Sequence, residues 1–206
     1  MLLEKLETLE SELYLLTFAD GVRARASAQL VLDYGLFAGL ELDGETFDRL
    51  LADCRYTEAL RAAAAMLTRR PLSAGELTRR LREKGADEQA AARAIARLLE
   101  LGLLDEAAYA EAVVRRCTAK GYGRRRAENE LARHLVPRQY WAEALEGLPE
   151  STEALDALVR KKLRGTEPDR DTLRKLAAAL CRRGFGWEEV RAAIARVVGD
   201  DGPEED

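Results

Sequence analysis

One stretch of the sequence gathers residues that can bind an anion. It reads KGYGRRRAENELARHL over residues 120–135, with Tyr122 between two glycines and three arginines directly after them. Arg124, Arg125 and Arg126 open a predicted helix, where cations oppose the positive end of the helix dipole. A bound anion would relieve that conflict and would also meet free backbone N–H groups. We therefore predict a docking loop for carboxylates of a protein or phosphates of DNA; the competing interpretation is a solvated loop with Tyr122 packed in the core.

Other basic side chains could extend this surface. Five arginines lie in helical segments before and after the loop. Arg79 and Arg82 have acidic neighbours on their helix, so each of these two, taken alone, is an ordinary solvated charge. A basic run at 160–164 ends a predicted helix, where compensation of the helix dipole alone explains it. The candidate partner-binding or DNA-binding residues are Lys120, Tyr122, Arg124, Arg125, Arg126, Arg79, Arg80, Arg82, Arg182 and Arg183.

Residues that usually carry catalysis or bind metals are sparse and dispersed. The single histidine, His134, ends a predicted helix, where it is favourable to the dipole. No GxxxxGK[ST] loop, GxSxG elbow or HExxH motif occurs. Cys54, Cys117 and Cys181 match no metal-binding spacing, so we expect free thiols with a structural role in a reducing compartment. We predict a protein that is not an enzyme and uses no metal or cofactor.

The composition predicts a mainly helical fold. Hydrophobic residues make up 47% of the 206 residues, charged residues 34% and aromatic residues 6%, with much Ala, Leu, Arg and Glu. No run of about 18 apolar residues occurs, so we expect no membrane span. The start, MLLEKLETLESEL, carries acids where a signal peptide would carry a basic region. We expect a cytoplasmic protein.

The charge is distributed unevenly along the chain. The net charge is −4, which argues against an indiscriminate polyanion binder. Residues 1–60 carry −7, residues 61–135 carry +6 and residues 136–206 carry −3, with five acids in the predicted acidic tail at 200–206. A basic centre between acidic ends fits a directed contact with an acidic partner.

Helices must position the basic loop, and their pattern repeats about every fifty residues. The segments that begin at Leu81, Leu131 and Leu180 align, and the helix that follows each one carries apolar residues at i, i+4 and i+7. We predict three-helix repeats at 57–104, 105–150 and 151–199, stacked as an elongated curved array. Their helices are expected at 57–69, 74–84, 88–101, 106–119, 124–134, 138–147, 152–164, 170–182 and 187–198.

The first 56 residues differ in texture from the repeats. Two short runs flank Ala19-Asp20-Gly21, and Asp-Gly between alternating segments predicts a β-hairpin. A short helix should end near Gly35, and GETFDRLLADC should form another helix with Asp43 as its cap. We therefore predict a small N-terminal segment with a hairpin and short helices.

Taken together, these motifs resemble the RecX family, bacterial regulators of the RecA recombinase. The likeness rests on AAAAMLTRRPLSAGELTRRLREKG, on the aspartate and tyrosine of GLLDEAAYAEAVVRR, on KGYGRRRAENEL and on LCRRGFGWEEVRAAI, over residues 57–198. The resemblance implies tandem three-helix repeats and a cytoplasmic monomer without a cofactor. It also implies binding to the RecA filament, with DNA contacted inside it, and inhibition of filament growth, ATP hydrolysis, strand exchange and coprotease activity. Lys120, Tyr122 and the arginine triplet then lie on the family's basic loop, whereas Asp105 and Tyr109 are expected to be structural.

Two other functions compete with this one. The alternative from another class is a sequence-tolerant DNA-binding protein or transcription regulator, and a third possibility is a scaffold for other proteins. The helix–turn–helix pattern around Gly85 fits a DNA-binding protein, but Asp87 and Glu88 at the start of the second helix of this pattern would face phosphates unfavourably. Base reading by that helix is therefore disfavoured.

Overall fold

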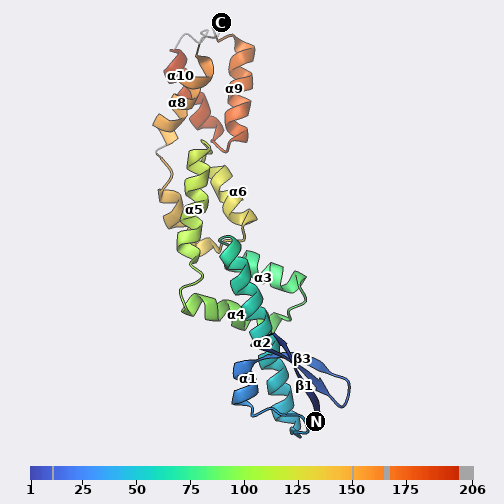
Figure 1. Ribbon diagram of the computed structural model, residues 1–206. Helices are drawn as coiled ribbons and strands as arrows, with labels where there is room; N and C mark the ends of the chain where they lie inside the picture. Colours follow the sequence, from blue (N-terminus) through green and yellow to red (C-terminus); the bar gives the residue numbers. More distant parts are fainter. Residues whose placement is uncertain (11, 150, 165–167, 200–206) are drawn as a thin grey trace. The chain divides into compact units, whose positions relative to one another are not determined.

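The computed structural model describes residues 1–10, 12–149, 151–164 and 168–199, so the acidic tail predicted at 200–206 lies outside the described residues. The chain divides into two compact units, Met1–Asp105 and Glu106–Asp206. Within the described ranges it forms ten α-helices, one 3-10 helix and one small sheet (Figure 1). The prediction of a mainly helical protein with a short N-terminal β-segment is confirmed.

The sheet is antiparallel with the strand order β1-β2-β3. Strands β2 (Leu13–Phe18) and β3 (Arg23–Ser27) form the predicted hairpin, and Asp20 Oδ1 accepts a hydrogen bond from the Val22 N–H in its turn. Strand β1 (Leu3–Glu10) was not predicted. Most of its side chains are exposed and only Leu3 is buried, so its sequence lacks the apolar alternation that indicates a strand.

A single long helix serves both the sheet and the first repeat. Helix α1 (Ala28–Asp33) is short, whereas α2 (Gly44–Arg69) has 26 residues and is capped by Asp43, whose Oδ1 accepts the Thr46 N–H at 2.8 Å. The cap was predicted, but the two helices expected at 44–54 and 57–69 are one. The N-terminal half of α2 packs Phe47 and Leu50 under the sheet, and the other half packs Ala63 into the first repeat.

The first repeat is completed by α3 (Ala74–Glu83) and α4 (Glu88–Glu100), close to their predicted ranges. A side chain caps the start of each helix: Ser73 Oγ accepts the Glu76 N–H, and Asp87 Oδ1 accepts the Ala90 N–H. Leu77 and Leu81 of α3 are fully buried against α2 and α4. Apolar periodicity therefore determines this core.

The second unit contains two further three-helix repeats, each with its own core. In the second repeat, α5 (Glu106–Ala119) and α6 (Arg124–Arg133) are followed by a 3-10 turn (Arg138–Tyr140) and α7 (Trp141–Glu146). The single helix expected at 138–147 is thus divided, since the turn after Pro137 closes with a tighter hydrogen bond from the Tyr140 N–H to the Pro137 carbonyl. The third repeat consists of α8 (Ser151–Leu163), α9 (Arg170–Arg182) and α10 (Trp187–Val198).

Candidate functional site

The predicted docking loop is also the place where the second and third repeats touch. The Gly123 N–H donates to the Arg183 carbonyl at 2.9 Å, and the Arg125 N–H donates to the Gly184 carbonyl at 3.1 Å. In return, Arg183 Nη1 donates to the Lys120 carbonyl at 3.0 Å. The start of α6 therefore meets the end of α9, and the partial charges of the two helix ends attract each other.

Two glycines make this close approach possible. A Cβ atom added to Gly123 would lie 2.6 Å from the Gly184 carbonyl oxygen, and one added to Gly184 would lie 2.3 Å from the Arg126 nitrogen. Gly184 also has a φ of +95°, which L side chains rarely adopt. We call this contact of residues 120–126 with residues 183–184 the glycine junction. Its glycines are required for packing between repeats and not only for a mobile turn.

The expectation of free N–H groups at the start of α6 is wrong for Gly123 and Arg125. Both N–H groups donate to carbonyls of the third repeat, so these carbonyls occupy the place where an anion was expected. Among the described residues, no side chain caps this helix start. The N–H groups of Gly123 and Arg125 are therefore not available to an acidic partner.

The three arginines of the loop have different environments. Arg124 forms an ion pair with Glu128 at 3.2 Å, and Arg126 forms one with Glu130 at 3.1 Å, each one helical turn further on. The Arg124–Glu128 pair is exposed and contributes only about 0.3–0.5 kcal/mol, so a partner's carboxylate can replace it. Glu130 is only 14% exposed and also pairs with Arg133. Arg125 is exposed and forms no ion pair with any residue that the structure describes. It is the arginine of this triplet most available to a partner.

Tyr122 is half-buried and packs on the core of the second repeat. The Arg126 guanidinium lies 5.5 Å from its ring centroid and the Lys120 ammonium 6.0 Å, both within reach of a cation–π contact. Tyr122 therefore both packs on the core and lies beside basic side chains, so its two interpretations are compatible. Both cations lie close to its ring.

The third repeat adds two exposed side chains next to the glycine junction. Arg182 ends α9 without an ion pair to any described residue. Trp187 begins α10 and is 56% exposed, although tryptophan is usually well covered. The acids after it are held within the protein, since Glu189 accepts the Gly186 N–H at 2.7 Å and Glu188 lies 3.7 Å from Arg191. Trp187 was not among the predicted site residues, because no sequence pattern shows that its side chain stays exposed.

Arg79, Arg80 and Arg82 belong to α3 in the first unit. Arg79 lies 3.7 Å from Glu83, and Arg82 is exposed. Arg80 is half-buried, and its Nε atom has no hydrogen-bond partner in the described part of the chain. Arg79 and Arg82 are therefore both exposed at i, i+3 on α3, whereas Arg80 is partly buried.

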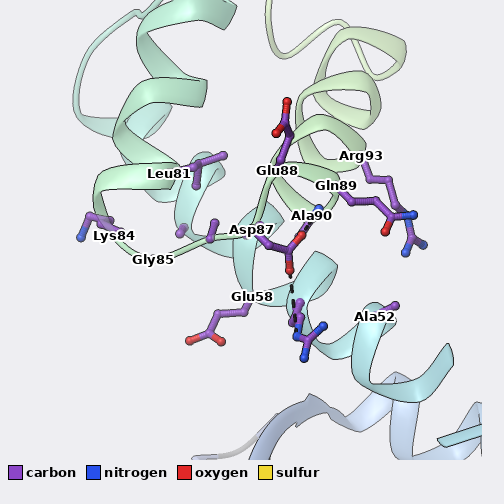
Figure 2. Close-up of a pocket in the computed structure, with 14 residues that line it drawn as sticks. Ala52, Glu58, Leu81, Lys84, Gly85, Asp87, Glu88, Gln89, Ala90 and Arg93 are labelled. Carbon is purple, nitrogen blue, oxygen red and sulfur yellow. Dashed lines mark hydrogen bonds and ion pairs between the residues drawn. The ribbon is translucent and has the colours of Figure 1, made fainter. Parts of the chain in front are cut away.

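Hollows are present in both units. A hollow of about 810 Å³ in the first unit lies between α2 and the α3–α4 turn, and Figure 2 shows Lys84, Asp87, Glu88 and Arg93 around it. Its charges balance one another, because Asp87 lies 4.0 Å from Arg55 of α2 and Arg93 lies 2.9 Å from Asp53. This hollow shows no preference for a ligand of either charge.

The second hollow, of about 580 Å³, borders the glycine junction. Tyr122 and Phe185 line it together with apolar side chains of α7 and α8, and so do the charged residues Arg124, Lys161, Glu146 and Glu189. It is a concave apolar surface beside the candidate docking residues, of the kind that accepts an apolar side chain.

Three family models match the chain in tandem. They describe the first, second and third three-helix domains of RecX and match residues 59–98, 105–145 and 150–194. The chain belongs to the RecX family. The glycine junction is therefore the contact between the second and third RecX domains. No helix among the described residues is long and apolar enough to cross a membrane.

Relatives and solved structures agree with the family. A protein named regulatory protein RecX from Chlorobaculum tepidum is 34% identical over 159 residues, 74% of this chain and 96% of the relative. One from Stenotrophomonas maltophilia is 36% identical over 141 residues, 68% of this chain and 86% of the relative. A crystal structure of regulatory protein RecX matches with a TM-score of 0.71 at 19% identity, over 97% of this chain and 98% of that one. RecX from Lactobacillus salivarius matches with a TM-score of 0.63 at 22% identity, over 71% and 98%.

Proposed function

We propose that this RecX-family regulatory protein binds the RecA–DNA filament and mainly inhibits its growth, ATP hydrolysis, strand exchange and coprotease activity. The family and the name of its relatives support a regulator, and the resemblance of its motifs implies RecA as the partner. The protein acts in the cytoplasm as a monomer and contacts DNA inside the filament.

The observation that carries the proposal is the group of exposed side chains around the glycine junction. Arg125, Arg182 and Trp187 are exposed, and neither arginine has an ion-pair partner within the described ranges. Tryptophan and arginine are the residues that most often dominate binding energy at protein interfaces. We propose that these three residues form one docking surface with Lys120 and Tyr122 of the glycine junction, and we call it the junction surface.

RecA's DNA-dependent ATPase activity tests the proposal. We expect the wild-type protein to inhibit it, and the variant with Arg125→Ala and Arg182→Ala to need about tenfold more protein for the same inhibition, equivalent to about 1.4 kcal/mol. Arg115→Ala is the matched control, because this exposed arginine of the same unit already pairs with Glu111 at 3.1 Å. Equal effects of the double variant and the control would exclude the junction surface as the docking site.

Single-stranded DNA binding is the second candidate function, and the exposure of Trp187 favours it. Aromatic side chains beside arginines stack with unpaired bases. Binding of an oligothymidylate without RecA should quench Trp187 fluorescence and weaken steeply with salt. Trp141 is an internal reference, because its indole N–H donates to the Val136 carbonyl at 2.9 Å. Quenching that persists in Trp187→Phe would argue against this function.

A further inference from the structure

The small sheet of the first unit has an open edge at strand β3. The Phe18 N–H donates to the Val22 carbonyl at 2.9 Å, and the β2–β3 pairing continues from there in a regular register. In an antiparallel pair, every second residue points its N–H and carbonyl to the partner strand, and the residues between point theirs away. The backbone groups of Arg23 and Arg25 therefore point away from β2, and no other described residue forms a hydrogen bond with them.

The other edge of the sheet, strand β1, is less suited to accept a further strand. Its register with β2 shifts at two places, between Leu3 and Lys5 and between Thr8 and Glu10. Its start is already paired, because the Leu3 N–H donates at 2.9 Å and the Leu3 carbonyl accepts at 2.8 Å, both with the segment 39–40. Bulges and charged side chains on an edge strand hinder the addition of another strand. The regular edge of β3 is therefore the better place for one.

A hollow of about 480 Å³ lies beside this open edge. Residues 22–25 of β3 line it, and residues of α2 line it too, among them Leu51, Cys54 and Glu58. An extended peptide that adds to a sheet edge gains affinity from main-chain hydrogen bonds and specificity from pockets for alternate side chains. Strand β3 can supply the hydrogen bonds, and the hollow can supply the pocket.

The open edge is basic, although the first sixty residues are acidic. These sixty residues contain five lysines and arginines, and three of the five, Arg23, Arg25 and Arg55, line the hollow. Arg23 is exposed and forms no ion pair with any described residue. Arg25 pairs with Glu58 at 3.0 Å, with 57% of each side chain exposed, and Arg55 lies 4.0 Å from Asp87. Such exposed pairs contribute little stability, so carboxylates of a ligand can replace them.

Arginines on an edge strand also prevent two copies of that strand from pairing. This effect explains a charged edge, but it explains neither the regular register nor the hollow. The charges that repel a second β3 attract a strand with acidic side chains, because residues directly opposite each other share one face of the sheet. Acids at alternate positions would therefore meet Arg23 and Arg25. The residues between them would lie on the face of Ala24 and Ala26, which packs toward α2.

We propose that the outer edge of β3 is a docking site for an extended segment of a partner protein in which acidic and apolar residues alternate. The segment adds to the sheet as a fourth strand. Its backbone pairs with the N–H and carbonyl groups of Arg23 and Arg25, its acids contact the arginines, and its apolar side chains enter the hollow beside α2. The site belongs to the first unit and does not depend on the proposed function, whose junction surface belongs to the second unit.

A synthetic peptide tests the site without RecA. The probe is a fluorescent, end-blocked peptide in which glutamate and valine alternate, and its binding to the unchanged protein is measured by fluorescence anisotropy. We expect saturable binding that weakens by on the order of tenfold or more when the glutamate N–H groups, which would face β3, are methylated. The matched control carries the methyl groups on the valine N–H groups, which would face solvent. Equal effects of the two methylation patterns, or no binding of the unmethylated probe, would overturn the proposal.

Hydrogen exchange measured by NMR locates the bound peptide. In the free protein we expect slow and fast exchange to alternate along β3, because Ala24 and Ala26 face the ladder and Arg23 and Arg25 face away from it. Saturating peptide should slow the exchange of the two arginine N–H groups by on the order of tenfold or more. Unchanged exchange at both would contradict the proposal. Protection of both in concentrated protein without peptide, with a dimer in analytical ultracentrifugation, would assign the edge to a second copy and overturn it as well.

Two substitutions at one position separate the backbone from the side chain. Arg25→Ala should weaken peptide binding by on the order of threefold, and Arg25→Pro by about tenfold more, since proline also removes the outward N–H. An edge strand tolerates proline where the missing N–H would face solvent. Arg49→Ala is the charge control, because this exposed arginine of α2 does not line the hollow. Equal effects of Arg25→Ala and Arg49→Ala would attribute binding to net charge and refute the site. The methylated peptides test the unchanged protein, so a proline variant that does not fold leaves the decision to them.

Discussion

Replacing Gly184 by alanine tests whether the glycine junction holds the second and third repeats together. The added Cβ would lie 2.3 Å from the Arg126 nitrogen and 2.5 Å from the Arg126 Cβ, distances at which the two segments must move apart. Movement would break the hydrogen bonds from the Gly123 and Arg125 N–H groups to the third repeat. We expect the junction to open while each repeat keeps its own core.

The magnitude follows from two contributions. An alanine at φ of +95° is strained by about 1–2 kcal/mol. Loss of two hydrogen bonds adds about 0.5–1.5 kcal/mol each, for a total of about 2–5 kcal/mol. Gly85→Ala is the matched control, since Gly85 has a φ of +91° and a Cβ there would meet nothing within 4 Å, which leaves only the strain. Gly123→Ala isolates the other contribution, because Gly123 has a φ of −80° that alanine adopts freely.

The assay combines urea denaturation with hydrogen exchange. The chain has two compact units, so a single transition is not assumed, and exchange at residues 120–126 and 183–186 reports the junction itself. Gly184→Ala and Gly123→Ala should accelerate exchange in both segments, whereas Gly85→Ala should not. If Gly184→Ala destabilised the protein no more than Gly85→Ala and left exchange at the junction unchanged, the contact would not stabilise the packing of the two repeats.

Three further predictions concern other parts of the chain. Burial raises the pKa of the Cys54 thiol to about 12, so a maleimide at pH 8 should label half-buried Cys181 first, and equally fast labelling of Cys54 in mass spectra would contradict this. Hydrogen bonds from Arg196 lower the pKa of Asp156 below 3.8. The stability that these hydrogen bonds give the folded protein is therefore complete above that pH and is lost as the pH falls through the lowered pKa. The melting temperature of Asp156→Asn should lack this loss in acid. Asp43→Ala removes the cap of α2 and should lower the free energy of unfolding by about 0.5–2 kcal/mol in urea, and an unchanged value would show that the cap is dispensable.

The repeat architecture could be predicted because its information is local and repeated. Buried residues recur on one face of each helix, and the ranges 106–119, 170–182 and 187–198 were predicted as α5, α9 and α10 have them. The division of α2 was wrong because the change of sequence pattern near residue 57, where the repeats begin, was taken as a helix boundary, although nothing between the two halves breaks a helix.

The candidate site could be predicted only in part. The basic residues of the loop are evident in the sequence, and even the pairing of Arg124 with Glu128 follows from their spacing. The contact of Gly123 with Gly184 joins residues about sixty positions apart, so no local pattern contains it. The exposure of Trp187 likewise depends on how the third repeat packs and not on its neighbours in the sequence.

The continuity of α2 determines how the first unit can be divided. A cut near residue 56 would divide α2 in its middle and leave only its N-terminal half, with Phe47 and Leu50, packed against the sheet. The remaining fragment would lose the preformed turns that precede Ala63, and helix initiation would have to occur anew at a site without a cap. Truncations designed to isolate the RecX domains should therefore keep the strands, and any swivelling of the sheet must be transmitted along α2 to α3 and α4.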